Sequence, residues 1–485
     1  MKKLLLLIIL LPYIGFAQWT QIGSDIDGNA TVDFSGFTVS LSADGNIIAV
    51  GAPRFTSDGE GYVKIYENIS GIWSQIGNGI DSDGVSTSLG TSLRLSSNGN
   101  IVAVGGYNIV RIYENISGVW TQIGDELQGE NPGDDFGYTI SLNNNGNILA
   151  VGSPNNDGNG NQSGSVRVFE NISGVWTQIG NDIDGEFEAN VSGSSIDLNG
   201  NGNIVAVGAP NNRESGLNTG HVRVFENISE VWTLIGSDID GESLGDSSGD
   251  SVSLNDQGDI VAIASPSNNT NGDSSGAVRI YKNISNSWTK IGNDIYGESS
   301  GDFAGKSLTI NYLGNIIALG GENNSSSAGI VRVYENISTV WTKIGTDIVG
   351  EFNSDGAGAY RHTISLNSDG YILAIGAPNN DGVAGGSGHV RVYGENSLSV
   401  TENNFEKNLS IYPNPSLGFS KILFGDVFSD ITIQIFDILG NEVLKKEYTN
   451  SNEIIINTQR YSKGTYLVKV FSNKNQTTLR LVIGN

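Results

Sequence analysis

Four short acidic runs contain the residues of this chain that could bind a cation. Two of them are Asp182-Ile-Asp184-Gly-Glu186 and Asp238-Ile-Asp240-Gly-Glu242, and similar runs begin at residues 25 and 294. A hard cation such as Ca²⁺ takes roughly six to eight converging oxygen ligands, whereas each run offers two or three acids in strand-like alternation. We expect the runs to form turns, with calcium binding as the alternative. The calcium candidates are Asp182, Asp184, Glu186, Asp238, Asp240 and Glu242.

The other titratable side chains form no catalytic arrangement. The chain has no cysteine, which excludes thiol nucleophiles and Cys-ligated metals. His221 and His389 precede Val-Arg-Val at the same position of two repeats, and we interpret both as structural. His362 has no nucleophile paired with it, so a Ser-His-Asp triad is unsupported, and no two acids stand out as a glycoside-hydrolase pair. We predict no catalytic residue and no cofactor, calcium excepted.

A basic residue recurs once in every repeat, in the strand that we expect to be third. A ring of such cations could bind an anion, but we expect ion pairs between neighbouring repeats or stems packed on tryptophan. The set is Lys64, Arg111, Arg167, Arg223, Arg279, Arg332 and Arg391.

A repeat marked by tryptophan positions these residues. All seven tryptophans begin five-residue segments similar to Trp19-Thr-Gln-Ile-Gly23, spaced 54, 47, 56, 56, 56 and 53 residues apart. Each repeat contains four short strand signals in a fixed order, rich in β-branched residues and bounded by turn formers. A unit of this size buries its sheet faces only against neighbouring units, as the blades of a propeller do.

The two ends of the repeat region are complementary. The chain begins with an isolated fourth strand at 19–23 and ends with a third strand at 388–393 that no tryptophan follows. A linear solenoid would need atypical terminal caps, whereas pairing these segments completes a seventh unit. We therefore predict an all-β fold, in which a seven-bladed β-propeller with four-stranded blades spans 18–395 and is closed by its N-terminal strand.

The third and fourth strands of each repeat are joined by a Glu-Asn-Ile-Ser-Gly segment that predicts a hairpin. With a register symmetric about that turn, Tyr66 faces Trp73 and Lys64 faces Gln75. Each such cross-strand aromatic pair contributes roughly 0.2–1 kcal/mol.

Variation among the repeats indicates where a ligand is recognised. The connection between the second and third strands ranges from residues 155–164 to Tyr107-Asn108 alone, and the connection from the fourth strand to the next repeat also varies. In a propeller both sets of loops emerge on one face. Because binding usually resides on loops held by a rigid scaffold, we predict that this face carries any recognition.

Several short motifs recur through the repeats: Phe136-Gly137, Val-Gly-Ala-Pro at 50–53 and 207–210, and Gly-x-Val-Arg-Val-Tyr/Phe after the long loops. On these motifs residues 19–395 resemble the FG-GAP family of β-propellers, best known from the integrin alpha head. The segments at 104–107 and 319–322 depart from the pattern. Integrin propellers place calcium loops between the first and second strands, but the equivalent connection here, such as 42–46, is too short for a calcium cage.

Residues 1–17 have the pattern of a cleaved secretory signal, with Lys2 and Lys3 before an apolar run and small residues before Gln18. The run is shorter than the roughly 20 residues that span a bilayer, so we predict no transmembrane segment after cleavage. The net charge is −26, and residues 403–485 alone have a basic excess. The acidic remainder should repel nucleic acid, which we exclude as a partner.

The last part of the chain predicts a separate small β-sandwich at 406–485, after a linker at 396–405. Three motifs occur in order there: a Tyr-Pro-Asn-Pro segment, a segment 436–440 and Gly-Thr-Tyr. They closely resemble those of the type A C-terminal sorting domain of the type IX secretion system. The residues that carry the resemblance are Tyr412, Pro413, Asn414, Pro415, Gly440, Gly464 and Tyr466.

The resemblance to a sorting domain implies a partner and a destination. The partner is the type IX secretion machinery, and the destination is the outside or outer surface of a Gram-negative bacterium. We predict a non-catalytic binding or adhesion protein whose ligand is an extracellular glycan or protein. The alternatives are a secreted hydrolase or lyase acting on polysaccharide, and a structural surface protein without a saturable ligand.

Ring closure predicts that the isolated first segment is essential. Deleting residues 19–23 should unfold the repeat region or make it oligomerise, because the last blade loses its outer strand and exposes an unpaired edge. Size-exclusion chromatography and thermal unfolding of the full-length and deleted chains measure this. A deleted chain that stays monomeric and as stable as the parent contradicts closure.

Overall fold

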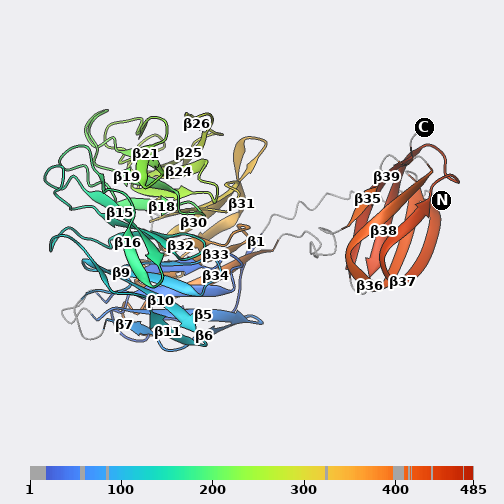
Figure 1. The fold of residues 1–485 in the computed structure, drawn as a ribbon, viewed down its shortest axis with the longest axis horizontal. Helices are drawn as coiled ribbons and strands as arrows, with labels where there is room; N and C mark the ends of the chain where they lie inside the picture. Colours follow the sequence, from blue (N-terminus) through green and yellow to red (C-terminus); the bar gives the residue numbers. More distant parts are fainter. Residues whose placement is uncertain are drawn as a thin grey trace, which may run out of the picture. The chain divides into compact units, whose positions relative to one another are not determined.

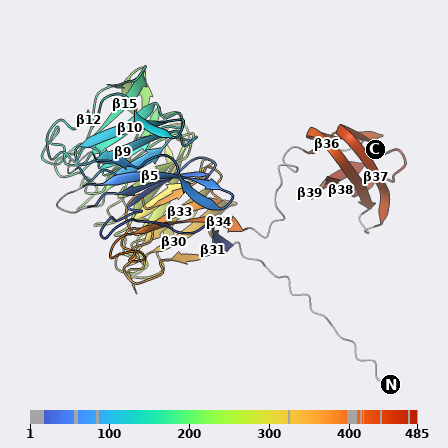
Figure 2. The same cartoon turned by 90° about the horizontal axis from the view of Figure 1, so that it is seen from below.

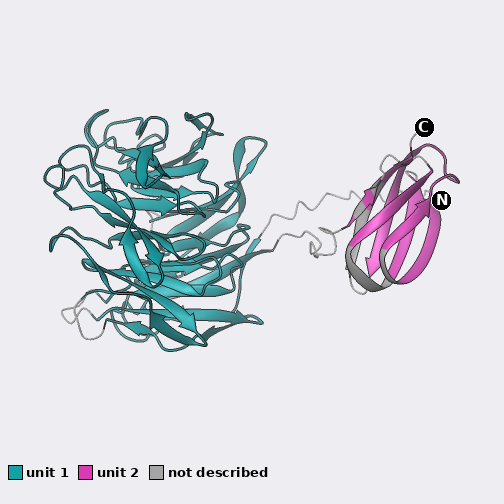
Figure 3. Ribbon diagram, in the orientation of Figure 1, with its two compact units in different colours: residues 1–396 teal, residues 397–485 magenta. Residues whose placement is uncertain are grey.

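The structure is a computed structural model that describes residues 18–54, 60–82, 87–322, 326–396, 409–412, 416, 418–437, 441–472 and 475–483. The chain divides into two compact units, residues 1–396 and 397–485 (Figure 3). The described residues contain many antiparallel strands and no helix, which confirms the all-β prediction. The predicted signal at 1–17 and all but the first residue of the linker at 396–405 lie outside the described residues.

The N-terminal unit contains seven antiparallel sheets, each with a first, second, third and fourth strand (Figure 1). The first strands are β3 (Thr38–Leu41), β8 (Ser92–Leu95), β13 (Thr139–Leu142), β18 (Ser195–Leu198), β23 (Ser251–Leu254), β28 (Ser307–Ile310) and β32 (Ile364–Leu366). The second strands are β4 (Ile47–Ala52), β9 (Ile101–Gly106), β14 (Ile148–Ser153), β19 (Ile204–Ala209), β24 (Ile260–Ser265), β29 (Ile316–Gly321) and β33 (Ile372–Ala377).

The outer half of each sheet is a hairpin. The third strands are β5 (Tyr62–Ile69), β10 (Ile109–Ile116), β15 (Ser165–Ile172), β20 (His221–Ile228), β25 (Ala277–Asn283), β30 (Ile330–Ile337) and β34 (His389–Asn396). The fourth strands are β6 (Ile72–Gln75), β11 (Val119–Gln122), β16 (Val175–Gln178), β21 (Val231–Leu234), β26 (Trp288–Lys290), β31 (Val340–Val349) and β1 (Gln18–Gln21). Two-residue strands also pair with six third strands: β7 (Ile80–Asp81), β12 (Leu127–Gln128), β17 (Ile183–Asp184), β22 (Ile239–Asp240), β27 (Ile295–Tyr296) and β2 (Ile26–Asp27).

The seventh sheet combines the two ends of the unit. Strand β1 pairs antiparallel with β34, with Trp19 opposite Glu395. The first strands lie beside one another in chain order, and β32 contacts both β28 and β3; Figure 2 shows the N-terminal blue strand beside β34. The second strands lie next to them and are almost entirely buried, because their apolar side chains are covered by the adjacent sheets on both faces.

The predicted register of the outer hairpins is wrong. Tyr66 lies opposite Gln75, and Trp73 lies opposite Asn68. The turn is the two-residue pair Ser70-Gly71, whose φ angles of 56° and 86° fit the type I′ turn that short hairpins prefer. The Oδ1 of Asn68 accepts the Gly71 N–H at 2.7 Å. The turn is therefore centred one residue later than predicted, and Trp73 does not pair directly with Tyr66.

The tryptophans instead join neighbouring sheets. The indole Nε1 of six of them donates a hydrogen bond of 2.9–3.1 Å to the backbone carbonyl of the isoleucine that follows the preceding fourth strand or continues it. The glycine after that isoleucine has a positive φ and lies against the same tryptophan. At Gly124, with a φ of +72°, an added Cβ would lie 2.7 Å from the carbonyl oxygen of Gly174 and 3.1 Å from Cδ1 of Trp176.

The C-terminal unit has one sheet in the described residues, and it encloses a single apolar core. Its strands are β35 (Ser410–Tyr412), β36 (Phe419–Asp437), β37 (Glu442–Asn457), β38 (Gly464–Ser472) and β39 (Asn475–Ile483). The pairing of β36 with β37 shifts register between Leu423 and Phe428. Side chains from both sides of this irregularity, such as Ile422 and Ile433, belong to the same buried cluster.

The close contact between Gly124 and Trp176 predicts that any side chain at position 124 destabilises the fold by steric overlap. A control glycine with a positive φ but open surroundings separates this overlap from the backbone cost. Gly124→Ala should lower the Tm of the full chain more than Gly174→Ala. Both glycines have a positive φ, but an added Cβ meets nothing within 4 Å at Gly174. The control bears only the backbone cost of about 1–2 kcal/mol, and Gly124→Ala adds about 1–3 kcal/mol of overpacking. Equal losses of Tm would contradict the close contact.

Candidate functional site

An aromatic pocket opens at the end of the first strands where the variable loops lie. It is a cavity of about 560 Å³. We define the aromatic pocket by six of its lining residues: Phe37, Tyr107, Tyr138, Lys306, Tyr360 and Arg361. The variable face thus contains a cavity suited to a small ligand, and its residues come from segments far apart in the sequence.

Two departures from the repeat form this pocket. Between β9 and β10 the connection is only Tyr107-Asn108, whereas other sheets carry long loops there. A glycine recurs before the first strand of each sheet. In the first six sheets a single residue separates this glycine from the first strand; in the third sheet, for example, Tyr138 lies between Gly137 and the start of β13. In the seventh sheet four residues, 359–362, lie between Gly358 and Thr363. The short connection leaves space, and the insertion supplies Tyr360 and Arg361 to its wall.

The inserted Arg361 is held in place by groups from other sheets. It forms an ion pair with Asp250, and its Nη1 donates to the Tyr138 hydroxyl at 2.6 Å. Burial alone would lower the pKa of Arg361, but Asp250 and Tyr138 raise it above its ordinary value. Tyr360 is anchored by the Asn379 amide, which donates to its hydroxyl at 2.7 Å.

Lys306 is the other cation of the aromatic pocket. Its Nζ lies 5.6 Å from the centre of the Phe303 ring. No carboxylate forms an ion pair with Lys306 within the described part of the chain. In a protein with a net charge of −26, a lysine without an acidic partner inside a cavity is a local anion-attracting group.

His362 also belongs to the lining of the pocket, and it stays neutral. Its Nε2 is buried and has no hydrogen-bond partner among the described residues. Burial lowers the pKa of His362 to about 3, and the charges of Arg94 and Arg361 act in the same direction. Asp135, also in the lining, has its pKa raised by burial and by Asp134, and it accepts a hydrogen bond of 2.6 Å from the Asn155 amide.

The six calcium candidates do not form one cage. Asp182 accepts a hydrogen bond of 2.7 Å from the Gln178 amide, and Glu242 pairs with Arg279 at 3.0 Å. Asp184 and Asp240 are exposed residues of β17 and β22. The remaining two, Glu186 and Asp238, come from different runs and lie close together.

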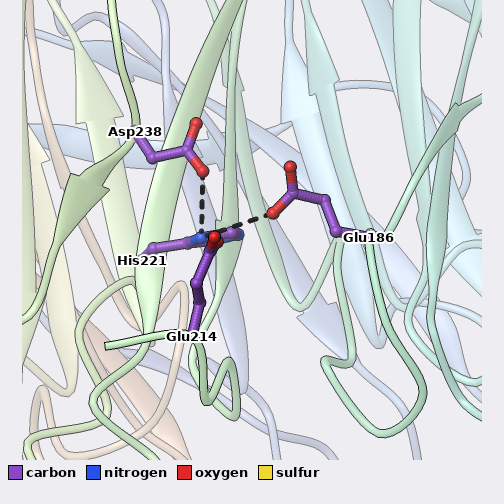
Figure 4. A group of neighbouring side chains, drawn as sticks. All are labelled: Glu186, Glu214, His221 and Asp238. Carbon is purple, nitrogen blue, oxygen red and sulfur yellow. Dashed lines mark ion pairs between the residues drawn. The ribbon is translucent and has the colours of Figure 1, made fainter. Parts of the chain in front are cut away.

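Glu186 and Asp238 meet around a histidine that the sequence did not single out as a ligand (Figure 4). Nδ1 of His221 lies 3.5 Å from Oδ2 of Asp238 and 4.0 Å from Oε2 of Glu186. Burial first, and the charge of Glu186 second, raise the pKa of Asp238 to about 6, and burial with the charge of Arg223 lowers the pKa of His221 to about 4. Glu214 from the loop between β19 and β20 completes the group. From the sequence His221 was interpreted as structural and Glu214 was not singled out, because the members of this group come from separate segments of the chain.

The recurring basic residues of the third strands are engaged in ion pairs and ring contacts. Arg111 pairs with Glu126 at 2.7 Å, Arg332 with Asp347 at 3.0 Å, and Arg391 with Asp25 at 2.7 Å. Arg167 instead lies over the Phe136 ring at 4.4 Å. These contacts leave no open ring of cations at those positions.

The sorting motif is only partly within the described residues. Tyr412 ends β35, and Gly464 and Tyr466 lie in β38, where the Tyr466 hydroxyl donates to the Ser462 carbonyl at 2.9 Å. Pro413, Asn414, Pro415 and Gly440 lie outside the described residues.

Residues 410–484 match the family described as the secretion system C-terminal sorting domain. The C-terminal unit is a type IX sorting domain. The chain is therefore cargo that the type IX machinery exports to the cell surface or the extracellular space of Bacteroidetes. Residues 129–169 match the FG-GAP repeat, which places that family in the N-terminal unit. No helix of the described residues is long and apolar enough to cross a membrane.

The proteins to which this chain is similar include a lyase and a solved bacterial structure. An endo-acting ulvan lyase of Formosa agariphila is 29% identical over 89 residues, which is 18% of this chain and 17% of the lyase. This chain thus matches less than a fifth of that relative's length. The solved structure of a candidate 6-phosphogluconolactonase from Bacteroides uniformis is 13% identical, with a TM-score of 0.48, and the match covers 68% of this chain and 89% of that one.

The lowered pKa of His362 predicts part of the acid sensitivity of the fold. Because the unfolded histidine has a pKa of about 6.5, protons bind the unfolded chain first, and stability falls as pH drops below about 6.5. His362→Asn should remove this contribution, so the variant should lose about 1–2 kcal/mol less stability than the parent between pH 7.5 and 4.5. Thermal unfolding of both chains at the two pH values measures it. Parallel pH profiles would contradict a buried neutral His362.

Proposed function

We propose that the N-terminal unit is a closed seven-bladed propeller that acts outside the cell as a non-catalytic binding module. The pairing of β1 with β34 and the contact of β32 with β3 support the closed ring. The aromatic pocket supports binding, because exposed rings gathered in a cavity with a lysine that has no ion-pair partner among the described residues stabilise a ligand more than they stabilise the fold.

The ligand that the aromatic pocket fits best is an acidic saccharide. Tyr107, with 62% of its surface exposed, and the partly exposed Tyr138 and Tyr360 present apolar ring faces against which a sugar ring packs. Lys306 supplies a charge that no described acid neutralises. The acidic body acts against an anionic ligand, but its field is screened over about 8 Å at physiological ionic strength, whereas Lys306 acts at contact distance.

The acids and the histidine in and beside the aromatic pocket are ion-paired, hydrogen-bonded or neutral, which supports a binding role over a catalytic one. Asp250 is paired with Arg361, Asp135 accepts from Asn155, and His362 is neutral at physiological pH. The alternative is a polysaccharide-degrading enzyme, which the similarity to an ulvan lyase and the raised pKa of Asp135 favour. A structural surface protein would bind no ligand saturably.

An array of acidic and neutral polysaccharides, ulvan included, tests these functions on the full chain. We expect saturable binding to an acidic polysaccharide and no release of product. Turnover that Asp135→Asn abolishes would make the protein an enzyme. Saturable binding of proteins alone would overturn the saccharide assignment, and no saturable ligand at all would favour the structural role.

Two substitutions in the aromatic pocket should separate the contribution of charge to ligand binding from that of ring packing. Lys306→Gln should weaken binding of an acidic polysaccharide about tenfold, or about 1.4 kcal/mol, and reduce its salt dependence. Tyr107→Ala should weaken binding about fivefold at all salt concentrations, because ring packing is not screened. Lys282→Gln is the matched control, since Lys282 is 3.4 Å from Asp259 and outside the pocket lining. An equal effect of both lysine substitutions would place the ligand elsewhere.

A further inference from the structure

His221 is a buried histidine whose ring makes no hydrogen bond. Its side chain is 0% exposed, and neither Nδ1 nor Nε2 has a hydrogen-bond partner among the described residues. A neutral imidazole always offers one donor and one acceptor. Buried polar groups of this kind are nearly always satisfied, so both nitrogens require an explanation.

Three carboxylates surround this ring from three different segments. Glu186 belongs to the segment that leads into the fourth sheet, Glu214 to the loop between β19 and β20, and Asp238 to the segment before β22. One ligand atom from each of these acids and one from His221 all lie within 4.8 Å of one another. Oε2 of Glu186 is also buried without a partner, whereas its Oε1 lies 3.5 Å from Arg223. Unsatisfied atoms from two residues therefore point into one space (Figure 4).

We propose that Glu186, Glu214, His221 and Asp238 bind one divalent transition-metal ion, such as Zn²⁺ or Mn²⁺. One imidazole nitrogen with carboxylate oxygens is a donor set for these ions, whereas Ca²⁺ takes oxygen ligands. Tetrahedral ligands at about 2.0–2.2 Å from zinc lie about 3.4 Å apart. The 3.5 Å between Nδ1 of His221 and Oδ2 of Asp238 already has this value. The other ligand atoms lie within 4.8 Å of one another, so they need to approach by about 1.4 Å at most.

The seventh sheet provides an internal comparison. His389 occupies the position of His221, and its Nδ1 lies 3.6 Å from Asp25. There, however, Arg391 donates to both oxygens of Asp25, at 2.9 and 2.7 Å. In the fourth sheet the equivalent Arg223 instead donates to the Asp184 carbonyl at 2.6 Å. Asp25, Asp27 and His389 also lie close enough to hold a metal. However, an arginine occupies both oxygens of Asp25, whereas no arginine pairs with Asp238 in the described residues, so the group around His221 is the better metal site.

A metal at this position would join the third and fourth sheets. Glu186 precedes the fourth sheet and follows β17 of the third, while Glu214 lies at the tip of a long loop. Coordination fixes that loop against the seam between the sheets. The site is separate from the aromatic pocket, and its function is to order the variable face.

Metal binding by the purified, chelator-treated full chain tests the proposal. Calorimetric titration with Zn²⁺, Mn²⁺ and Ca²⁺ should give one equivalent of Zn²⁺ or Mn²⁺ per chain and weaker binding of Ca²⁺. Glu214→Gln and His221→Asn should each weaken Zn²⁺ or Mn²⁺ binding at least tenfold, and His389→Asn should leave it unchanged. Bound metal should also raise the Tm of the parent chain more than that of the Glu214→Gln variant.

Three results would overturn the assignment: no saturable binding of Zn²⁺ or Mn²⁺ by the parent chain, binding unchanged by both substitutions, or tighter binding of Ca²⁺. Glu214 is exposed, so Glu214→Gln keeps the test valid if His221→Asn does not fold.

Discussion

The hydrogen bond from a tryptophan indole to the preceding sheet, which six of the seven tryptophans make, is the interaction on which the N-terminal unit depends. The sheets share no strand, so side chains and loops alone must hold one against the next. The bond ends at the isoleucine carbonyl because the following glycine turns the chain with a positive φ. A Cβ added at that glycine would press on the next sheet: at Gly124 it would lie 2.7 Å from the Gly174 carbonyl oxygen and 3.1 Å from Cδ1 of Trp176. The tryptophan of one pentapeptide therefore contacts the isoleucine and glycine of the preceding copy, so the three recurring residues act together across the interface between two sheets.

Because the same contact recurs between most neighbouring sheets, the regions of functional interest are those where the sequence departs from the repeat pattern. The aromatic pocket exists because one connection is shortened and three extra residues precede the first strand of the seventh sheet. The acidic group around His221 exists because the segment before the fourth sheet also departs from the repeat pattern. In other sheets a buried aspartate of this segment, such as Asp246 or Asp302, caps a turn and faces the third-strand arginine. Asn190 stands at that position, so Arg223 lacks this charge, and its contacts are with the Asp184 carbonyl and with Glu186.

Sequence reasoning predicted what local pattern determines and missed what distant segments create together. The strand order, the apolar second strands and the pairing partner of Trp19 follow from periodicity and turn residues. The hairpin register was misplaced because Glu-Asn-Ile-Ser-Gly contains two candidate turn centres, and only the positive φ of Ser70 distinguishes them. The acidic runs suggested calcium binding within single loops. In the structure the acids of one run have different surroundings, and Glu186 of one run lies close to Asp238 of the next. The insertion 359–362 was readable as a length difference, but its contact with Asp250 required the fold.

The joint between the two chain ends is built differently from the other six. Nε1 of Trp19 is buried without a hydrogen-bond partner in the described residues. The preceding fourth strand, β31, is ten residues long in total, so it continues where the others end after three or four residues. A bidentate ion pair compensates, in which Arg391 of β34 holds Asp25 just after β1. Burial would raise the pKa of Asp25, but the hydrogen bonds from Arg391 and Gln21 keep it below its usual value. Arg111 and Arg332 also pair with acids of their own sheets. In the seventh sheet the acid comes from the opposite end of the unit, so the pair between Arg391 and Asp25 helps to fix the register of β1 against β34.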